Sequence, residues 1–414
     1  MAVEERSARY FRILLLLLIP AAFFNGFDGE LRALLAPQLQ RAFHVSLGTL
    51  GLANVPIAAG SFIAFFAIRL ADRVGRRPLL LFGLFGYGLF TGLTATSWSV
   101  WSFVLFQSLT QIFAGTEFAL AAIVVLEEFP TATRGRALGK LLLAVPLGTG
   151  ATAVLLGAGL QHAGLGWRSF YLVGVVPALA IGVARRYVRE TAAFTEARSN
   201  HPRKEPMGAA LVKPWRRRVF ALGFVSLLVK IPVTAGAGWW VYYAERERHF
   251  STGLVSVDLG TAVVLGTAGY YVCGRLIDRF GRKPVATVYF LAACASGVAL
   301  FHSSTEAANF VFLTLAVFFG LGVGPALSAM SAESFPTRIR AQASAIVGNG
   351  FANTGEVTGG SIVGVLSERG GLIGNIGDSV SVLSVLLLAA LPILWRFVPE
   401  TKGTRLDDVP DVIA

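Results

Sequence analysis

Long apolar runs separated by short polar loops follow one another along nearly the whole chain. Each run has about 20 residues, the length that an α-helix needs to cross the ~30 Å hydrocarbon layer of a membrane. In lipid the backbone N–H and C=O groups must pair within the segment, so each run is expected to be helical. The pattern predicts an all-α membrane protein with twelve transmembrane helices, at 12–37, 47–70, 78–97, 100–128, 137–162, 168–188, 217–243, 251–275, 284–302, 308–335, 341–367 and 378–398.

The stretch 189–216 interrupts this pattern after the sixth run. It is polar and basic and contains three prolines. A segment of this composition between two sets of six apolar runs is typical of a linker. The sequence therefore predicts a six-helix bundle at 1–188, a linker at 189–216 and a second six-helix bundle at 217–414.

The composition agrees with a membrane protein. Of the 414 residues, 54% are hydrophobic and 14% are charged, whereas a soluble chain has about 25% charged residues. The net charge of +12 raises nucleic acid as a partner, but the charges lie in short loops between apolar runs, which excludes that class. Cys273 and Cys294 lie in apolar segments, and no nucleophile, metal cluster or phosphate loop stands out. We expect no enzyme activity, no cofactor and no metal site.

The distribution of Lys and Arg predicts the orientation. Twenty-nine of the 36 basic residues lie at the N-terminus, in alternate loops, in the linker and at the C-terminus. Five lie in the remaining loops and two lie inside spans. Cytoplasmic loops carry the basic excess, so both termini and the linker are expected in the cytoplasm of a multi-pass protein of the cell (inner) membrane.

Two loop motifs occur twice at the same spacing. Arg69–Pro78 reads RLADRVGRRP, and 206 positions later Arg275–Pro284 reads RLIDRFGRKP. The pattern Glu-x-Phe-Pro-Thr-x-x-Arg at 127–134 recurs at 333–340 with the same offset. The chain is therefore an internal duplication. Both copies begin on the cytoplasmic side, which predicts parallel halves that rock around a central cavity.

Along its whole length the chain resembles the major facilitator superfamily. The strongest shared motif is Asp-Arg-x-Gly-Arg-Arg/Lys, which occurs here in both halves. The family usually begins this motif with Gly, which Gly274 supplies in the second half, whereas Ile68 stands there in the first. We expect the first hairpin to pack less tightly than the second. Removing the charge of Asp72 or of Asp278 should then have unequal effects on transport.

The branch of the family is predicted from shorter motifs. Val398-Pro-Glu-Thr-Lys-Gly403 is similar to the tail of sugar porters and organic-ion transporters. The sequences Gly-Phe-Asp-Gly at 26–29 and Gly-Thr-Glu-Phe at 115–118 are more similar to metabolite:proton symporters. The alternatives that remain open are a sugar or polyol symporter, an organic-ion transporter and a membrane sensor without transport.

Charged residues inside membrane spans are functional candidates, because each costs roughly 2.5–3.5 kcal/mol to insert at mid-span. Asp28 and Arg32 share one helical face in the first span, so they can pair. Asn353, Glu356 and Gly360 continue a polar stripe from Asn349 and are expected to line the cavity. The predicted proton-coupling residues are Asp28, Glu117 and Glu356.

The predicted substrate contacts combine cations for a carboxylate with amides and rings. Lys230 either holds the substrate or neutralises Glu117 or Asp28. The aromatic residues either stack on a substrate or form an interfacial belt. The predicted contacts are Arg32, Lys230, Asn349, Asn353, Gln111, Phe27, Trp239 and Tyr243.

In the family the repeated hairpins act as a conformational latch on the cytoplasmic side, and the resemblance carries this role onto both copies here. Arg73, Arg76, Arg279 and Arg282 are expected to pair with Glu127, Glu128 and Glu333 at the ends of the fourth and tenth spans, while the aspartates meet helix N-termini. The latch residues are Asp72, Arg73, Gly75, Arg76, Glu127, Arg134, Asp278, Arg279, Gly281, Arg282, Glu333 and Arg340.

These features together predict a monomeric, alternating-access secondary transporter. Its partners are the lipid bilayer, protons and a small-molecule substrate, expected to be an organic acid or a related metabolite taken up with protons. The resemblance supplies the mechanism, and the charged residues inside the spans supply the substrate class.

Overall fold

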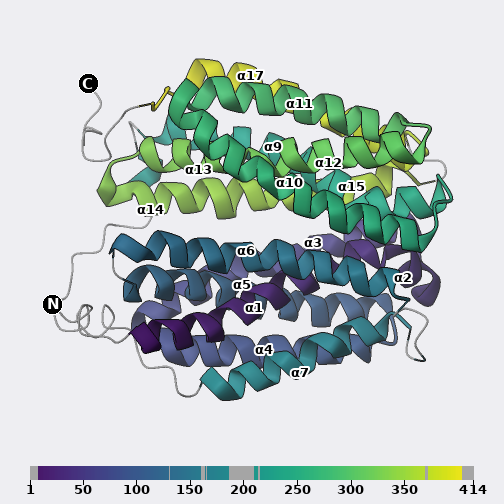
Figure 1. Ribbon diagram of the computed structural model, residues 1–414, viewed down its shortest axis with the longest axis horizontal. Coiled ribbons are helices and arrows are strands. Elements are labelled where there is room, and N and C mark those ends of the chain that lie inside the picture. Colours follow the sequence, from purple (N-terminus) through teal and green to yellow (C-terminus); the bar gives the residue numbers. More distant parts are fainter. Residues whose placement is uncertain are drawn as a thin grey trace. The chain divides into compact units, whose positions relative to one another are not determined.

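The structure is a computed structural model that describes residues 8–129, 131–159, 164, 166–185, 209–212, 215–368 and 372–402. Within these ranges the chain is helical, and no strand occurs there. Figure 1 labels the helices in chain order. The all-α prediction is therefore confirmed for the part of the chain that is described.

The helices before the linker cover the first six predicted spans. A kink of 108° separates the short α2 from the beginning of α3. The elements are α1 (Ala8–Leu34), α2 (Ala36–Phe43), α3 (Leu47–Val74), α4 (Arg76–Ala95), α5 (Val100–Glu128), α6 (Thr131–Gly157) and α7 (Arg168–Arg185).

The helices after the linker cover the other six predicted spans, and three of those spans are subdivided. The elements are the short 3₁₀ helix η2 (Ala209–Leu211), α9 (Arg216–Arg246), α10 (Thr252–Phe280), α11 (Arg282–His302), α12 (Glu306–Gly322), α13 (Gly324–Glu333), α14 (Thr337–Ala345), the π-helix η3 (Ile346–Ala352), α15 (Asn353–Leu366), α16 (Ile376–Ser384) and α17 (Leu386–Phe397).

The subdivisions add breaks inside three of the predicted spans. α12 ends at Gly322 and α13 begins at Gly324, with Pro325 in its first turn, where proline cannot continue the hydrogen-bond ladder. The glycine-rich segment of the eleventh span forms the π-helix η3. Among the described residues, nine helices are long and apolar enough to cross a membrane, and the bent pair α2–α3 brings the number to ten.

The chain divides into two compact units. Unit 1 comprises Met1–Val45, Ala53–Arg203 and Ser251–Gly260. Unit 2 comprises the rest, so the first residues of α3 belong to unit 2 and the first residues of α10 to unit 1. Residues 46–52 thus group with the later part of the chain, and residues 251–260 group with the earlier part.

In unit 1, α1 packs along α6, while α4 packs between α5 and α7. Gly26 of α1 lies against the Val145 carbonyl group of α6, and Gly148 lies against that of Phe23. A Cβ atom at either glycine would overlap the facing backbone. Glycine thus allows the two helices to approach closely in lipid, where small residues favour packing.

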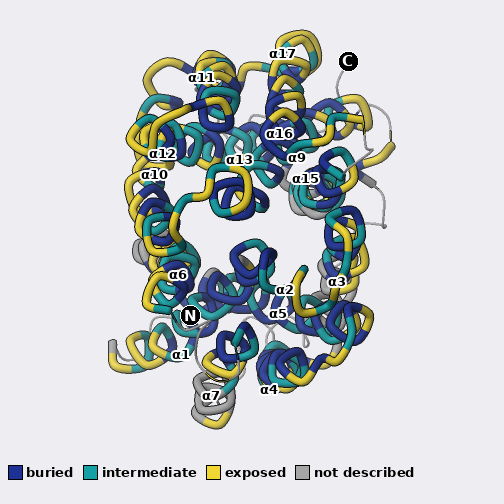
Figure 2. The backbone as a smooth tube through the Cα atoms, turned by 90° about the vertical axis from the view of Figure 1, so that its right-hand side faces the viewer, coloured by how far each residue is buried: buried dark blue, intermediate teal, exposed yellow. Residues whose placement is uncertain are grey.

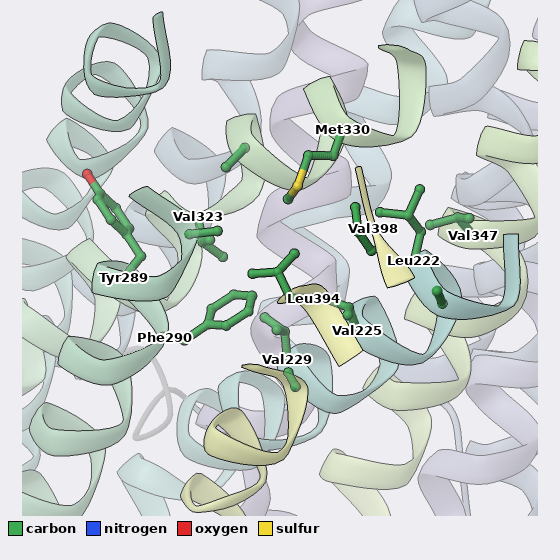
Figure 3. Close-up of a cluster of buried hydrophobic side chains, with 14 of the residues drawn as sticks. Leu222, Val225, Val229, Tyr289, Phe290, Val323, Met330, Val347, Leu394 and Val398 are labelled. Atoms are coloured by element: carbon green, nitrogen blue, oxygen red, sulfur yellow. The ribbon is translucent and has the colours of Figure 1, made fainter. Parts of the chain in front are cut away.

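In unit 2, α9 is the central helix and packs against α15, α16, α17 and η3. Its apolar side joins residues of α11, α13 and α17 in one buried cluster (Figure 3). Leu222, Val225 and Val229 recur at helical spacing along α9 and lie in this cluster. In the most apolar stretch of α9, 56% of the residues are buried, as expected for a helix in the centre of its unit.

Candidate functional site

Asp28 and Arg32 lie one turn apart on α1 inside unit 1. The Asp28 carboxylate is buried, and its Oδ1 atom has no hydrogen-bond partner among the described residues. The Arg32 Nη1 atom is also buried without a partner there. The two charges interact, but no direct ion pair between them occurs in the described part of the chain. Such unsatisfied buried groups are suited to bind a proton, water or a polar group of a substrate.

Two tyrosines surround this pair. Tyr87 of α4 donates a hydrogen bond from its hydroxyl group to the Phe24 carbonyl oxygen of α1 at 3.0 Å. Tyr171 of α7 is fully buried, and its hydroxyl oxygen has no hydrogen bond to a described residue. Both phenol groups interact electrostatically with Asp28, and that of Tyr171 also interacts with Arg32. The candidate proton site is therefore built from α1, α4 and α7.

Sequence reasoning missed both tyrosines. In the sequence each is only a tyrosine within an apolar run. Tyrosines in such runs also occur at helix interfaces with no functional role. The 3.6-residue period tells which residues of one helix share a face. It does not tell which other helix that face meets, and this contact is what brings Tyr87 and Tyr171 to Asp28.

Glu117 of α5 is also buried, with 2% of its surface exposed. It faces Gly83 of α4, where an added Cβ atom would lie 3.4 Å from the Glu117 Cβ atom. Tyr87 feels the charge of Glu117 as well as that of Asp28. Tyr87 is therefore a common neighbour of two predicted proton carriers. Gln111, earlier on α5, is half-buried.

Unit 2 contains a second charged group inside the membrane spans. The Lys230 Nζ atom of α9 lies 3.6 Å from the Glu356 Oε2 atom of α15, and the side chains are 40% and 55% exposed. Tyr270 of α10 feels the charge of Lys230. Lys230 thus has its charge partner in its own unit. The distance is long for a charge-assisted hydrogen bond, so the pair is loose enough to exchange partners with a bound anion.

The π-helix η3 lies immediately before the helix that carries Glu356. Its extra residue per turn rotates the preceding segment by about 100° relative to a uniform α-helix. The predicted stripe through Asn349 and Glu356 assumed α-helical spacing throughout, and the backbone departs from that spacing over Ile346–Ala352. Asn353 begins α15 and is half-buried, while the Asn349 side chain lies outside the described part.

Three predicted substrate contacts are engaged in packing. Trp239 is 3% exposed, and its Nε1–H donates to the Gly360 carbonyl oxygen at 2.9 Å. Tyr243 is also 3% exposed and donates from its hydroxyl group to the Phe301 carbonyl oxygen at 2.7 Å. Phe27 is 2% exposed. In this structure none of these three rings is accessible to a substrate, because each is buried within its own unit.

In unit 1 one predicted latch pair is present. The Arg76 Nη2 atom lies 3.0 Å from the Glu127 Oε1 atom, joining the beginning of α4 to the end of α5. Gly75 precedes α4 with a φ angle of +112°, a conformation that glycine adopts readily. The remaining predicted latch residues of this half, Asp72, Arg73 and Arg134, lie outside the described side chains.

In unit 2 the corresponding pair is bidentate. The Arg282 Nε and Nη2 atoms donate to the two Glu333 carboxylate oxygens at 3.0 and 2.8 Å. The Asp278 side chain is 77% exposed, and its Oδ1 atom lies 3.7 Å from the Arg282 Nη2 atom. This ion pair joins two residues of the same hairpin. Gly281 repeats the positive φ angle of its counterpart, at +99°. A Cβ atom at Gly274 would meet no atom of a described residue within 4 Å.

The other two predicted latch residues of unit 2 contact the backbone or a ring. The Arg340 Nε–H donates to the Phe335 carbonyl oxygen at 3.2 Å. The Arg279 guanidinium lies 5.2 Å from the centre of the Phe280 ring. These contacts place Arg340 at the start of α14 and Arg279 at the end of α10.

The tail after α17 closes this hairpin, which sequence reasoning missed. The Glu400 carboxylate accepts hydrogen bonds from the Arg282 and Lys283 backbone N–H groups, both at 2.9 Å, and so caps the beginning of α11. Thr401 donates to Glu333, and the Lys402 Nζ atom donates to the carbonyl group of Arg279. The Pro-Glu-Thr-Lys-Gly motif marks this tail in the sequence, but the motif alone indicates a branch of the family and not a helix cap.

Burial disfavours the charge on Glu400, but four backbone N–H donors hold the pKa of its carboxyl group below the usual 4.5. Because the pKa is lower in the folded than in the unfolded chain, the carboxylate stabilises the fold above pH 4.5. This contribution is lost as the pH falls through the folded pKa. We expect Glu400→Gln to lower the melting temperature in detergent at pH 7. The difference from the parent protein should shrink below pH 4.5 and disappear once the pH is below the folded pKa.

Glu306→Gln, which changes an exposed carboxylate in the first turn of α12, is the control. A difference between Glu400→Gln and the parent that persists unchanged at acidic pH would contradict the capping role of the charge. Circular dichroism and thermal melts over a pH series measure both variants.

The family model of the Major Facilitator Superfamily matches residues 18–324 and 241–412. The match covers nearly the whole chain and includes both copies of the repeated hairpin. The chain therefore belongs to the major facilitator superfamily, a family of membrane transporters. The fold is the two-bundle helical fold of that family.

Individual proteins that are similar to this chain are also named as transporters. A probable 4-methylmuconolactone transporter of Cupriavidus pinatubonensis is 27% identical over 406 residues, which cover 94% of this chain and 91% of the relative. The 3-(3-hydroxy-phenyl)propionate transporter of Escherichia coli is 24% identical and covers 92% and 90%. A bacterial homologue of the human lysosomal transporter Spinster, solved in an inward-facing and occupied conformation, superposes with a TM-score of 0.77 at 17% identity, covering 94% and 97%. The protein is thus a multi-pass membrane transporter with relatives that carry metabolites and organic acids.

Proposed function

We propose that this chain is an alternating-access transporter that imports a small organic acid together with protons. The bundles 1–188 and 217–414 are its two working halves, and the latch pairs at Arg76 and Arg282 are made and broken during the cycle. The proposal includes cytoplasmic termini, an inner-membrane location, a monomeric working unit and no catalytic activity. The basic loops on one side of the spans support the orientation.

The observation that carries proton coupling is the buried carboxylate of Asp28. It lies near Arg32 without a direct ion pair, in a surrounding of phenol groups rather than bulk water. A charge in such a place is costly, and proton uptake removes the charge of the carboxylate. A carboxylate of this kind inside a transporter is a proton-relay candidate. Glu117 is the second candidate, because it shares the neighbour Tyr87.

The observation that supports an acidic substrate is the exposed Lys230. Its ammonium group is held only loosely by Glu356, so a substrate carboxylate can replace that partner. Two relatives are named for 4-methylmuconolactone and 3-(3-hydroxy-phenyl)propionate. We propose that this chain takes substrates of the same broad class, small organic acids with an apolar ring.

Uptake into proteoliposomes tests the proposal. The protein is reconstituted with an imposed pH gradient, alkaline inside, and challenged with labelled aromatic acids, dicarboxylates, sugars and organic cations. We expect an organic acid to accumulate above its external concentration only while the gradient lasts. Accumulation of a sugar or cation instead, or uptake that ignores the gradient, would refute the proposal.

We expect Lys230→Gln to weaken the binding of the transported acid about ten-fold. The reason is the loss of one charge-assisted contact, worth about 1.5 kcal/mol. Binding is measured by thermal shift with the acid identified in the uptake screen. Lys140→Gln removes an exposed lysine of α6 and serves as the control. An unchanged affinity in Lys230→Gln would exclude the contact.

A further inference from the structure

A cluster of cations lies where α9 begins and α17 ends in unit 2. The Arg217 guanidinium lies 4.8 Å from the centre of the Phe397 ring, and the Arg396 guanidinium lies 6.0 Å from the same ring. Arg217, Arg396 and Phe397 are all exposed. Because α9 and α17 pack against each other, the Phe397 ring contacts one cation from each of the two helix ends.

No carboxylate of the described residues forms an ion pair with Arg217 or Arg396. A third cation is close by. The buried Lys283 side chain donates from Nζ to the Trp395 carbonyl oxygen at 3.1 Å and lies 4.9 Å from the centre of the Trp395 indole ring. Arg217 and Arg396 have no counter-ion among the described residues, and a bound anion would relieve the repulsion between them.

The beginning of α9 adds to the positive potential. Trp215 precedes α9 and makes no side-chain cap, and the first turn contains no acidic residue. The first N–H groups of a helix carry about half a positive charge in total and favour an anion. Here Arg216, Arg217 and Arg218 occupy that turn, where basic residues are unfavourable unless an anion binds.

An exposed apolar stripe leads away from this cluster. Leu388, Pro392 and Trp395 share one face of α17, and all three are exposed, as is Val385 immediately before the helix. Val288 of neighbouring α11 is also exposed, at 58%. Figure 2 shows exposed segments on both helices. In a membrane protein such a face is covered by acyl chains, with Trp at the level of the head groups.

We propose that this cluster is a binding site for an anionic phospholipid. The phosphate lies between Arg217 and Arg396 at the beginning of α9, and the acyl chains follow the exposed face of α17. A free phosphate ion would use only the cations, whereas a phospholipid uses both the cations and the apolar stripe. The site lies outside the substrate and proton sites and does not depend on their assignment.

Native mass spectrometry of the purified full-length protein tests the site. The probes are dimyristoyl phosphatidylglycerol, dimyristoyl phosphatidylcholine of the same chain length, and glycerol 1-phosphate as a head group without chains. We expect phosphatidylglycerol to bind most tightly and glycerol 1-phosphate not to compete at equal concentration. Each of Arg217→Gln and Arg396→Gln should weaken phosphatidylglycerol binding roughly five-fold, and the double variant about thirty-fold.

Two controls keep the result interpretable. Arg275→Gln removes an exposed arginine that lies 3.7 Å from the centre of the Tyr271 ring on α10, away from the beginning of α9, and should leave binding unchanged. The double Lys variant at Arg217 and Arg396 keeps both charges and should retain most of the binding if the fold is intact. Equal binding of phosphatidylcholine, unchanged binding in the double Gln variant, or an equal loss in Arg275→Gln would overturn the proposal. Full competition by glycerol 1-phosphate would show a simple phosphate site instead.

Discussion

Asp28→Asn is expected to abolish accumulation driven by a pH gradient, while exchange of labelled substrate across the membrane continues. The substitution keeps the size of the side chain but removes its ability to gain and lose a proton. The buried position offers no bulk water that could replace this role. We expect the accumulation ratio to fall to about one, a loss of at least ten-fold from a coupled transporter. Uptake and counterflow in the same proteoliposomes separate coupling from transport.

Asp378→Asn is the matched control, because this carboxylate is 55% exposed and pairs with His302 at 3.3 Å. It should retain gradient-driven accumulation. Tyr171→Phe removes only the buried hydroxyl group of a residue that interacts electrostatically with Asp28, and should shift the pH profile of uptake without abolishing it. If Asp28→Asn accumulates substrate as the parent does, proton coupling does not pass through Asp28. Glu117→Gln then becomes the deciding variant.

Arg282→Met is expected to have the largest effect on stability. It removes both hydrogen bonds to Glu333 and leaves that carboxylate, 15% exposed, with Thr401 as its recorded hydrogen-bond donor. Breaking one side of a buried pair costs about 3–5 kcal/mol, and partial exposure reduces this to about 2 kcal/mol. In a protein of this size we expect the melting temperature in detergent to fall by about 2 °C.

The double variant Arg282→Met/Glu333→Gln provides the test of the pair itself. Because it leaves no unpaired charge at these two positions, it should regain part of the lost stability. Arg76→Met is the counterpart in unit 1, where Arg76 and Glu127 form the recorded pair at 3.0 Å. If the double variant is no more stable than Arg282→Met, the pair does not carry the stability of this hairpin.

The two hairpins show how far sequence repetition can be taken. The 206-residue offset predicted the pairs Arg76–Glu127 and Arg282–Glu333, and both are present. Their role as a latch remains a prediction. The offset did not predict that Glu400 would cap α11, since that contact joins residues more than 100 positions apart. The sequence Val-Arg-Glu-Thr at 188–191, which is similar to the start of the tail motif, lies outside the described residues.

The charged residues inside the spans illustrate a second limit. Insertion cost alone marked Asp28, Glu117, Lys230 and Glu356 as unusual. Helical phase then suggested pairing between Asp28 and Arg32, yet the structure leaves both with unsatisfied atoms. Helical spacing also did not identify the ion-pair partner of Lys230, which is Glu356 in the structure.

The sequence by itself determined the helical membrane fold, the duplication and the residue types that carry charge into the spans. Hydrophobic length and helical period act within one segment, so they can be read without knowing any neighbour. The tertiary structure decided which helices face one another. It surrounded Asp28 with Tyr87 and Tyr171, turned Trp239 and Tyr243 into packing residues, and joined α9 and α17 at Phe397. These contacts depend on how whole helices pack, through close approach at glycines and the fit of side chains, and no single segment encodes them.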